Sequence, residues 1–388
     1  MSEPSEQELR DIAHRLVTQS MRIGRRADGS FEGVRLMYNR SDPACEQFAL
    51  MVEEECWRVG ASVLREGMTF ARERLRHTLM PTEALGRLNH VLDAVVRNID
   101  AYLFIGESDE PSWAAAIPER FLAAAPVRQR LREIMDERAV RWVYFGWPLP
   151  TAAQAYGMDV HRFRGIFFNS IRESFTQSTL ERCRYYGAAL SNKSRVEVRA
   201  DDGTEWRAEI HGRPVLIDDG IISPEDIARG DVGNNIPAGE AFVAPLESTA
   251  EGRILFPHVS TQAFGNVRNL LVEFREGRII RFEADEGGDN FRRFLDANTG
   301  DKDRIAELGI GCNAGAEYTG GSIIIDEKIL GTIHMAIGNN TGAYHGANKA
   351  SSHLDMIKDM ARGQLYVDGE LVMDRGRPVR GNNGHERD

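Results

Sequence analysis

The stretch VRLMYNRSDPACEQFALMVEEECWRVGASVLRE (residues 34–66) places a short β-rich run, a longer helical pattern and a second β-rich run in succession. The same alternation continues through AYLFIG (101–106), PERFLAAAPVRQRLREIMDERA (118–139) and RWVYFG (141–146). Strands that alternate with helices are typical of βαβ units on a mostly parallel sheet. The sequence therefore predicts an N-terminal α/β domain over residues 1–190.

The pattern changes after residue 146. Residues 147–190 form a helical connector, and from about Arg195 the chain changes to short strands and turns with only brief helices. The runs that indicate this second region are SRVEVRADDGTEWRAEIHGRP (194–214), GRILFPHVS (252–260), NLLVEFREGRIIRFEAD (269–285), GSIIIDEKI (321–329) and QLYVDGELVMD (364–374), a closing hairpin that turns at Asp368 and Gly369. We expect a boundary near residue 190 and a β-rich α+β domain over 191–388, with a frayed tail, GNNGHERD, at 381–388.

Composition and charge exclude several classes of protein. The 388 residues carry a formal net charge of -11, which argues against nucleic acid as a partner, because phosphate binding needs a surplus of Lys and Arg on one face. Four cysteines lie far apart in the sequence, as expected of reduced thiols in a cytoplasmic protein. No run approaches the roughly 18 apolar residues of a membrane span, so we expect no membrane anchor.

Candidate metal ligands concentrate in the last quarter of the chain, in IHMAIGNNTGAYHGANKASSHLDMI (333–357). His353 and Asp355 are two residues apart, and residues at that spacing on a strand point to the same face. One imidazole and one carboxylate could thus converge on one ion. His334 lies in an apolar run that ends in glycine, where a strand would carry it into the same region. Taken alone, it is better interpreted as a hydrogen-bonded core histidine.

Two carboxylates add to this candidate site. Glu240 lies between a turn and an apolar strand in NNIPAGEAFVAP (234–245), where a buried carboxylate is costly unless it is paired or bound to metal. Glu307 precedes the glycine-rich stretch LGIGCNAGA (308–316), which lets the backbone approach closely. Together with the histidines and Asp355 they form an N/O donor set that suits zinc, cobalt or manganese, with enough carboxylates to bridge two divalent ions. Each residue alone is also compatible with a structural role.

The same glycine-rich stretch fits the dinucleotide fingerprint at Gly309, Gly311 and Ala314. No strand clearly precedes these residues, no helix clearly follows, and the βαβ half of the chain is distant. We therefore interpret the match as accidental and expect Cys312 to be a small buried residue rather than a reactive thiol.

The strings NNIPAGEAFVAP (234–245), AELGIG (306–311), GTIHMAIGNN (331–340) and SSHLD (351–355), in this order, resemble the thermophilic-type metallo-aminopeptidases, often called leucyl aminopeptidases. The resemblance covers residues 195–375 and implies a dinuclear site. The ligands that it implies are Glu240, Glu307, His334, His353 and Asp355. It also implies a peptide substrate and a homodimer.

The resemblance includes one departure. The family's tyrosine is expected seven residues after His334, where this chain has Thr341. The nearest tyrosine is Tyr344, ten residues after His334, which is the candidate for the catalytic role or else a loop aromatic. The adjacent His345 is a second candidate proton carrier.

Three further functions stay open. The same fold family includes iron-dependent dioxygenases that open dihydroxypyridine rings, in which a histidine replaces the acid at the Glu307 position and the groups at the Glu240 and His334 positions are lost. This sequence keeps all three, which favours a hydrolase. The second function is that of a small-molecule amidohydrolase or deaminase that uses the same site, and the third is that of a non-enzymatic metal-binding or scaffold protein.

Overall fold

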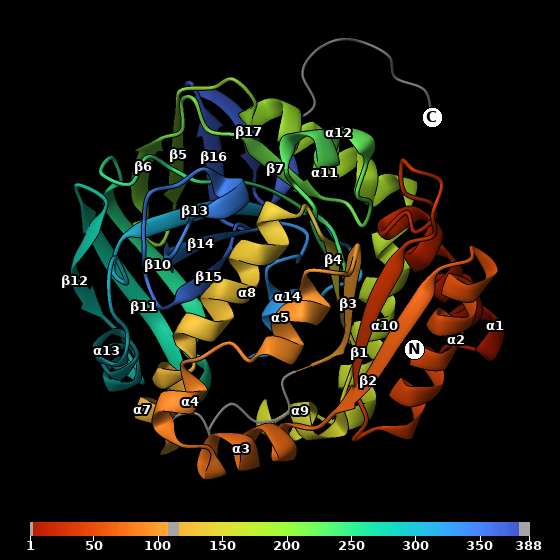
Figure 1. Ribbon diagram of the computed structural model, residues 1–388. Helices are drawn as coiled ribbons and strands as arrows, with labels where there is room; N and C mark the ends of the chain where they lie inside the picture. The colour runs from red at the N-terminus through yellow and green to blue at the C-terminus, as the bar shows by residue number, and fades with distance from the viewer. Residues whose placement is uncertain (1–2, 108–115, 380–388) are drawn as a thin grey trace, which may run out of the picture.

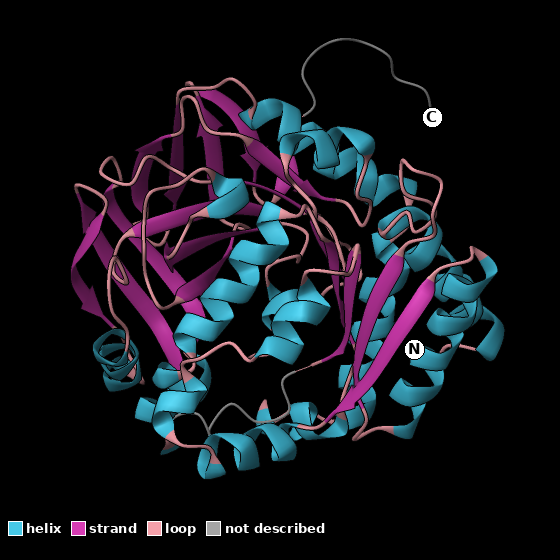
Figure 2. Ribbon diagram, in the orientation of Figure 1, coloured by secondary structure: helices cyan, strands magenta, loops and turns pink. Residues whose placement is uncertain are grey.

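The computed structural model describes residues 3–107 and 116–379, and the predicted frayed tail lies outside them. Two sheets organise these residues, one parallel and one large and mostly antiparallel, with helices on their outer faces (Figures 1 and 2). This mixed α/β architecture confirms the predicted fold class. None of the described helices is long and apolar enough to cross a lipid bilayer.

The first sheet is parallel throughout and has the order β2-β1-β3-β4-β8. Its strands are β1 (Gly33–Asn39), β2 (Ser62–Met68), β3 (Ala101–Gly106), β4 (Arg141–Gly146) and β8 (Gly233–Ile236). The first four coincide with the β-rich runs of the sequence. Hydrophobic periodicity and the alternation with helices were therefore sufficient to predict them.

Helices cover both faces of the parallel sheet (Figure 1). One face carries α1 (Glu6–Arg15), α2 (Pro43–Arg58) and α10 (Val160–Ser174), and the other carries α5 (His90–Val96) and α8 (Ala125–Glu137). The remaining helices of this half and the connector are η1 (Leu16–Ser20), α3 (Phe70–Leu79), α4 (Thr82–Leu85), α7 (Pro118–Ala123), α9 (Pro150–Ala155) and α11 (Gln177–Leu190). The connector is helical, as predicted.

Aromatic side chains fix the packing of α2 and α10 on the parallel sheet. Phe48 of α2 lies 4.8 Å from the ring of Phe145 and 5.2 Å from that of Trp147, centroid to centroid. Trp147 in turn meets Phe168 of α10 edge to face at 5.6 Å. All four are buried, and side chains of this size dominate the free energy of a core.

The second sheet has the order β18-β17-β16-β5-β6-β10-β15-β14-β13-β9-β7, and β11 and β12 extend from β10. Its strands are β5 (Arg195–Ala200), β6 (Glu205–Glu209), β7 (Val215–Asp218), β9 (Glu240–Val243), β10 (Glu251–Ser260), β11 (Asn266–Arg275), β12 (Arg278–Glu283), β13 (Ile305–Gly311), β14 (Thr332–Gly338), β15 (His353–Asp359), β16 (Gly363–Val367), β17 (Glu370–Asp374) and β18 (Arg377–Pro378). Its helical segments are α12 (Pro224–Arg229), η2 (Gln262–Phe264), α13 (Gly288–Ala297), α14 (Ile323–Asp326) and η3 (Gly342–Tyr344).

Local sequence accounts for several details of this sheet. In the closing hairpin, Asp368 and Gly369 have φ values of 50° and 83°, which the tight turn between two strands requires. Gly309 and Gly311 lie within β13, and this strand pairs with an antiparallel strand on each edge, β14 on one and β9 on the other. This is not the strand-to-helix turn of a dinucleotide site, so the rejection of that motif is confirmed. Cys312, next in the chain, is buried as predicted.

The chain crosses between the two sheets after residue 190. Strand β8 pairs in parallel with β4 in the first sheet, and β9 begins at Glu240 in the second. Only residues 237–239 separate the two strands. The helical segment α14, within GSIIIDEKI, is a second element at the junction of the two halves, and its Ile324 and Ile325 belong to the core of the parallel sheet.

Candidate metal centre

Four neighbouring antiparallel strands carry the five residues that the sequence singled out. Glu240 begins β9, Glu307 lies on β13, and His334 lies on β14. His353 and Asp355 lie two residues apart on β15. Because the strands are hydrogen-bonded side by side in the order β15-β14-β13-β9, the structure brings all five residues into one cluster.

Glu307, His353 and Asp355 form the first of two groups of possible ligands, with ligand atoms within 4.8 Å of one another. Nε2 of His353 lies 3.2 Å from Oε2 of Glu307 and 3.3 Å from Oδ1 of Asp355. Nδ1 of the same ring lies 2.7 Å from the backbone carbonyl of Asn339. That contact orients the imidazole and directs Nε2 toward the carboxylates, as outer contacts of metal-binding histidines do.

Glu240, Glu327 and His334 form the second group, again with ligand atoms within 4.8 Å. Nε2 of His334 lies 3.5 Å from Oε2 of Glu240. Glu327 follows α14 and was not among the predicted ligands. The available signal was the charged stretch 326–328, which follows three isoleucines. Charged groups beside an apolar run are costly unless they are paired or bound to metal, as argued for Glu240.

The carboxylate of Glu307 connects the two groups. Its Oε1 lies 3.1 Å from Nε2 of His334, and its Oε2 lies 3.2 Å from Nε2 of His353. A carboxylate with one oxygen at each group is suited to bridge two cations.

Tyr344 reaches this carboxylate as well. Its hydroxyl donates a hydrogen bond of 2.9 Å to Oε2 of Glu307. The ring centroid lies 5.6 Å from that of Phe242 and 5.9 Å from that of His353. The neighbouring His345 is exposed, and its backbone carbonyl accepts a hydrogen bond from Arg213. Of the two proton-carrier candidates, Tyr344 is the one in contact with the cluster.

The charges of the cluster shift the pKa values of its own members. Burial lowers the pKa of His334, but the hydrogen bond with Glu307 and the charge of Glu240 outweigh burial and raise it to about 9. Burial opposes ionisation of Glu307, yet hydrogen bonds from the two histidines hold its pKa well below the usual range. Burial raises the pKa of Glu240 to about 7, against the opposing charge of Lys328. The high pKa of His334 shows that the surrounding carboxylates stabilise positive charge.

A fully buried lysine lies behind the second group. Nζ of Lys328 lies 2.7 Å from Oε1 of Glu240, 2.5 Å from Oε1 of Glu327 and 3.4 Å from Oδ2 of Asp218. The ammonium therefore contacts one oxygen of each glutamate. This contact leaves the other oxygen of each available to a ligand.

The residues present fit a divalent metal. Oε2 of Glu240 is buried and has no hydrogen-bond partner among the described residues. An unpartnered buried carboxylate oxygen is costly, and a cation beside it would remove that cost. The donors are imidazole nitrogens and carboxylate oxygens, a set that suits zinc, cobalt or manganese.

Gly309 makes room for His334 within the cluster. A Cβ atom at Gly309 would lie 2.0 Å from Nε2 of His334, across the β13-β14 pair. No side chain could be placed there without moving the imidazole. Gly309, in the glycine-rich stretch after Glu307, therefore allows the imidazole of His334 to lie close to the backbone of β13.

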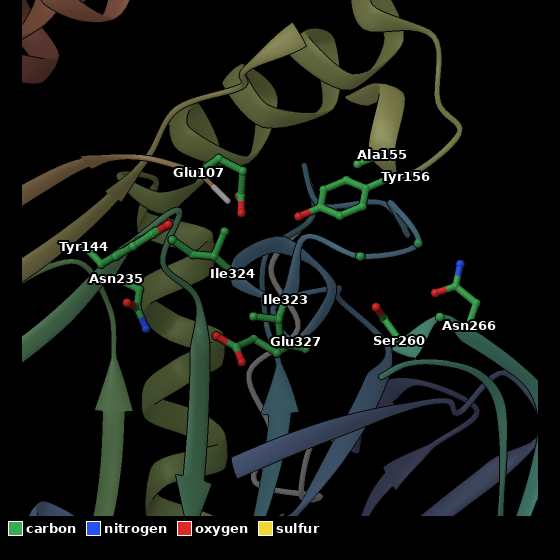
Figure 3. A pocket seen from close by; sticks show the side chains of 13 residues that line it. Glu107, Tyr144, Ala155, Tyr156, Asn235, Ser260, Asn266, Ile323, Ile324 and Glu327 are labelled. Atoms are coloured by element: carbon green, nitrogen blue, oxygen red, sulfur yellow. The ribbon is translucent and has the colours of Figure 1, made fainter. Parts of the chain in front are cut away.

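Two cavities border the cluster. The larger, of about 480 Å³, is lined in part by Glu327 and is shown in Figure 3. The smaller, of about 250 Å³, is lined in part by His353 and Asp355. They share Ser260, Gly321 and Ile323, so together they give access to the cluster from two adjoining sides.

Comparison with solved structures shows where this fold occurs. Wild-type AmpT from Thermus thermophilus matches with a TM-score of 0.75 at 18% sequence identity, over 97% of this chain and 100% of that chain. The 2,5-dihydroxypyridine dioxygenase from Pseudomonas putida KT2440 matches with a TM-score of 0.63 at 15% identity, over 98% and 99% of the two chains. No curated protein matches the sequence significantly.

The family comparison covers nearly the whole chain. The family model of the thermophilic metalloproteases (M29) matches residues 32–379. This range contains all the motifs that carried the resemblance. The chain therefore belongs to the thermophilic metalloprotease family M29 and is a metal-dependent hydrolase.

Proposed function

We propose that this protein is an aminopeptidase that acts with two divalent cations, of zinc, cobalt or manganese, held by two adjoining ligand groups. The observation that carries the proposal is the position of Glu307, whose two carboxylate oxygens face one group each. One cation would be held by Glu240, Glu327 and His334, and the other by His353 and Asp355, with Glu307 shared.

The chain's own residues define the rest of the site. Bound divalent cations would supply an activated water as the nucleophile and polarise the scissile carbonyl. Tyr344 would hold Glu307 in place by donating its hydroxyl proton to that carboxylate. The partly buried carboxylates of the cluster would receive the free amino terminus of the substrate, which makes the enzyme an exopeptidase.

The composition of the cluster favours this function over ring opening. A ferrous dioxygenase needs a single ion and a two-histidine, one-carboxylate triad. Here Glu307 occupies the position at which the resemblance places a histidine in the dioxygenases. Glu240 and His334 are both present, and Nε2 of His334 lies 3.1 Å from Glu307 and 3.5 Å from Glu240. A cytoplasmic location and a homodimer stay predictions from the sequence.

The test is metal content together with peptide hydrolysis. We expect about two ions per chain in purified protein by elemental analysis, and release of N-terminal residues from a panel of aminoacyl chromogenic substrates with added cobalt or zinc. Glu307→Gln and His353→Ala should both lower metal content and abolish hydrolysis. His211→Ala, at an exposed histidine in the turn after β6, is the matched control.

Three results would contradict the proposal. Full activity of either variant in a metal-bound form would exclude the ligand assignment. One ferrous ion per chain with oxygen consumption would indicate the dioxygenase. Two ions with hydrolysis of small amides, but no release from any aminoacyl substrate, would indicate a small-molecule amidohydrolase.

A further inference from the structure

The larger cavity extends from the metal cluster to the edge of the parallel sheet. Glu327, a member of the second ligand group, lines one side. Glu107, which directly follows β3, lines another together with Tyr144 of β4 and Asn235 of β8. Figure 3 shows the carboxylates of Glu107 and Glu327 on opposite sides of the cavity, with Ile323 between them. A group bound beside the cluster could therefore extend a chain toward Glu107.

The charge of this cavity has one sign. Of the described residues that line it, Glu107 and Glu327 are carboxylic acids, and none is Lys, Arg or His. A cavity lined by one sign of charge between low-dielectric walls attracts the opposite sign. Because Lys328 and the proposed cation offset the charge of Glu327, the end of the cavity at Glu107 is the part that favours a cationic group and disfavours a carboxylate.

Glu107 is held in a fixed position at the cavity wall. The residue is buried, and its Oε2 accepts a hydrogen bond of 2.7 Å from Oγ of Ser322. Figure 3 shows its carboxylate and the hydroxyl of Tyr156 pointing toward the same part of the cavity. Burial, and then the charge of Glu107, raises the pKa of both Tyr144 and Tyr156, so these phenols stay neutral. Their hydroxyls can donate hydrogen bonds without adding negative charge.

Apolar surface lies between the two ends. Ile323 and Ile324 contribute to the lining between Glu327 and Glu107. Lysine and arginine have this same division, with a methylene stem that packs on apolar surface and a charged head that needs polar partners. A guanidinium has five donors in a planar fork, which suits a carboxylate in a cavity whose lining also offers an amide oxygen, that of Asn235.

We propose that this cavity binds a substrate side chain that ends in a guanidinium or ammonium group, and that Glu107 is the specificity-determining residue. The proposal rests on the aminopeptidase function given above and names its substrate class: peptides with a basic residue at or next to the amino terminus. Binding of the α-ammonium group itself at Glu107 is the main competing interpretation, because it would also use a carboxylate.

Dipeptides that differ only in charge test the proposal. The probes are Arg-Leu and Leu-Arg, each compared with its citrulline counterpart, which replaces the guanidinium by a neutral urea of the same shape. At one of the two positions we expect kcat/KM to favour arginine over citrulline by about tenfold or more. In Glu107→Gln, whose amide can still accept from Ser322, this ratio should fall to near one. In Glu133→Gln, an exposed acid on α8, it should stay as in the wild type.

The readout separates specificity from other roles of Glu107. Loss of rate by the same factor for arginine and citrulline peptides in Glu107→Gln would overturn the proposal in favour of α-ammonium binding or a structural role. A wild-type ratio near one at both positions would overturn it as well.

A measurement of ligand binding, which needs no peptide hydrolysis, tests this proposal separately from the aminopeptidase function on which it rests. If the metal-loaded wild type cleaves no dipeptide, the aminopeptidase function fails. The Glu107 proposal is then decided by calorimetry with L-argininamide and L-citrullinamide. Tighter binding of argininamide that disappears in Glu107→Gln supports the cationic site, and equal binding of the two amides refutes it.

Discussion

Nζ of Lys328 lies 2.7 Å from Oε1 of Glu240, so a candidate metal ligand is also one partner of a buried ion pair. The same ammonium contacts Glu327 and Asp218, so one fixed positive charge faces two buried carboxylates and one partly buried carboxylate. A cation bound in this group would share two of those carboxylates with the lysine. The lysine and the cation therefore stabilise the same negative charges, and the effect of removing one depends on the other.

Replacing this lysine should make folding depend on metal. In Lys328→Met without metal, the free energy of unfolding should fall by about 3–5 kcal/mol, because the buried Asp218 and Glu240 and the partly buried Glu327 lose their common partner. Added zinc, cobalt or manganese should recover more of that loss than it adds to the wild type. Urea unfolding after chelation, with and without added ion, measures both quantities.

Lys358→Met provides the matched control. Lys358 is also fully buried, and its Nζ lies 2.6 Å from Oδ2 of Asp202, away from the candidate ligands. Its replacement should cost a similar amount without any additional recovery on addition of metal. An equal response of the two lysine variants to metal would contradict the shared-charge interpretation.

Removing the hydroxyl of Tyr344 tests its position on Glu307. Tyr344→Phe keeps the ring beside Phe242 but loses the 2.9 Å hydrogen bond. We expect kcat to fall by about 10- to 100-fold with metal content unchanged, because the hydroxyl positions Glu307 but is not itself a ligand. Tyr366→Phe, whose hydroxyl donates to Gln364 on the same strand, is the control. An unaltered kcat would show that Tyr344 is only a loop aromatic.

A single methyl group at position 309 should damage the metal site. In Gly309→Ala the new Cβ would lie 2.0 Å from Nε2 of His334, so the imidazole must move. We expect the number of bound ions per chain to fall, as measured by elemental analysis of folded protein. Gly24→Ala is the control, because its Cβ would meet no atom within 4 Å. Wild-type metal content in Gly309→Ala would show that His334 is not needed as a ligand.

A partly buried carboxyl, that of Asp219 beside Asp218, should make stability depend on pH. Burial raises the pKa of Asp219 to about 6, above the value of about 3.9 in an unfolded chain. The folded state therefore binds this proton more tightly, and its stabilising effect is complete below pH 4 and is lost as the pH rises through 6. At pH 8, Asp219→Asn should be more stable than the wild type by about 1–2 kcal/mol, after allowance for partial exposure.

The check is chemical unfolding of both proteins at several pH values between 4 and 8. The difference between them should open between pH 4 and 6 and then stay constant. Glu286→Gln, an exposed acid, should show no such trend. Parallel stability curves for Asp219→Asn and the wild type would contradict the predicted shift.

Patterned segments of the fold could be predicted from the sequence, and polar ones could not. The strands at 33–39, 62–68, 101–106 and 141–146 have apolar runs bounded by helices, and all four were predicted. Strand β8 has the sequence GNNI, four residues without an apolar pattern. Its pairing with β4 depends on tertiary contacts, so no local signal placed it in the parallel sheet.

The candidate ligands on patterned strands could also be predicted from the sequence, whereas those positioned by loops and tertiary packing could not. Spacing on a strand placed His353 and Asp355 together, and the motif order associated them with Glu240, Glu307 and His334. Glu327 was missed because it follows a one-turn helix whose position is set by packing against the parallel sheet. The contact of Tyr344 with Glu307 depends on the loop around η3, which sequence spacing does not define.

The three residues between β8 and β9 limit how the two halves of the molecule can move. Ile236 ends a strand of the parallel sheet, and Glu240 begins a strand of the second sheet. Four Cα-to-Cα steps reach at most about 14 Å. Any opening of the space between the sheets must therefore pivot near Glu240, so that the cluster moves least and the parts of the two sheets farthest from it move most.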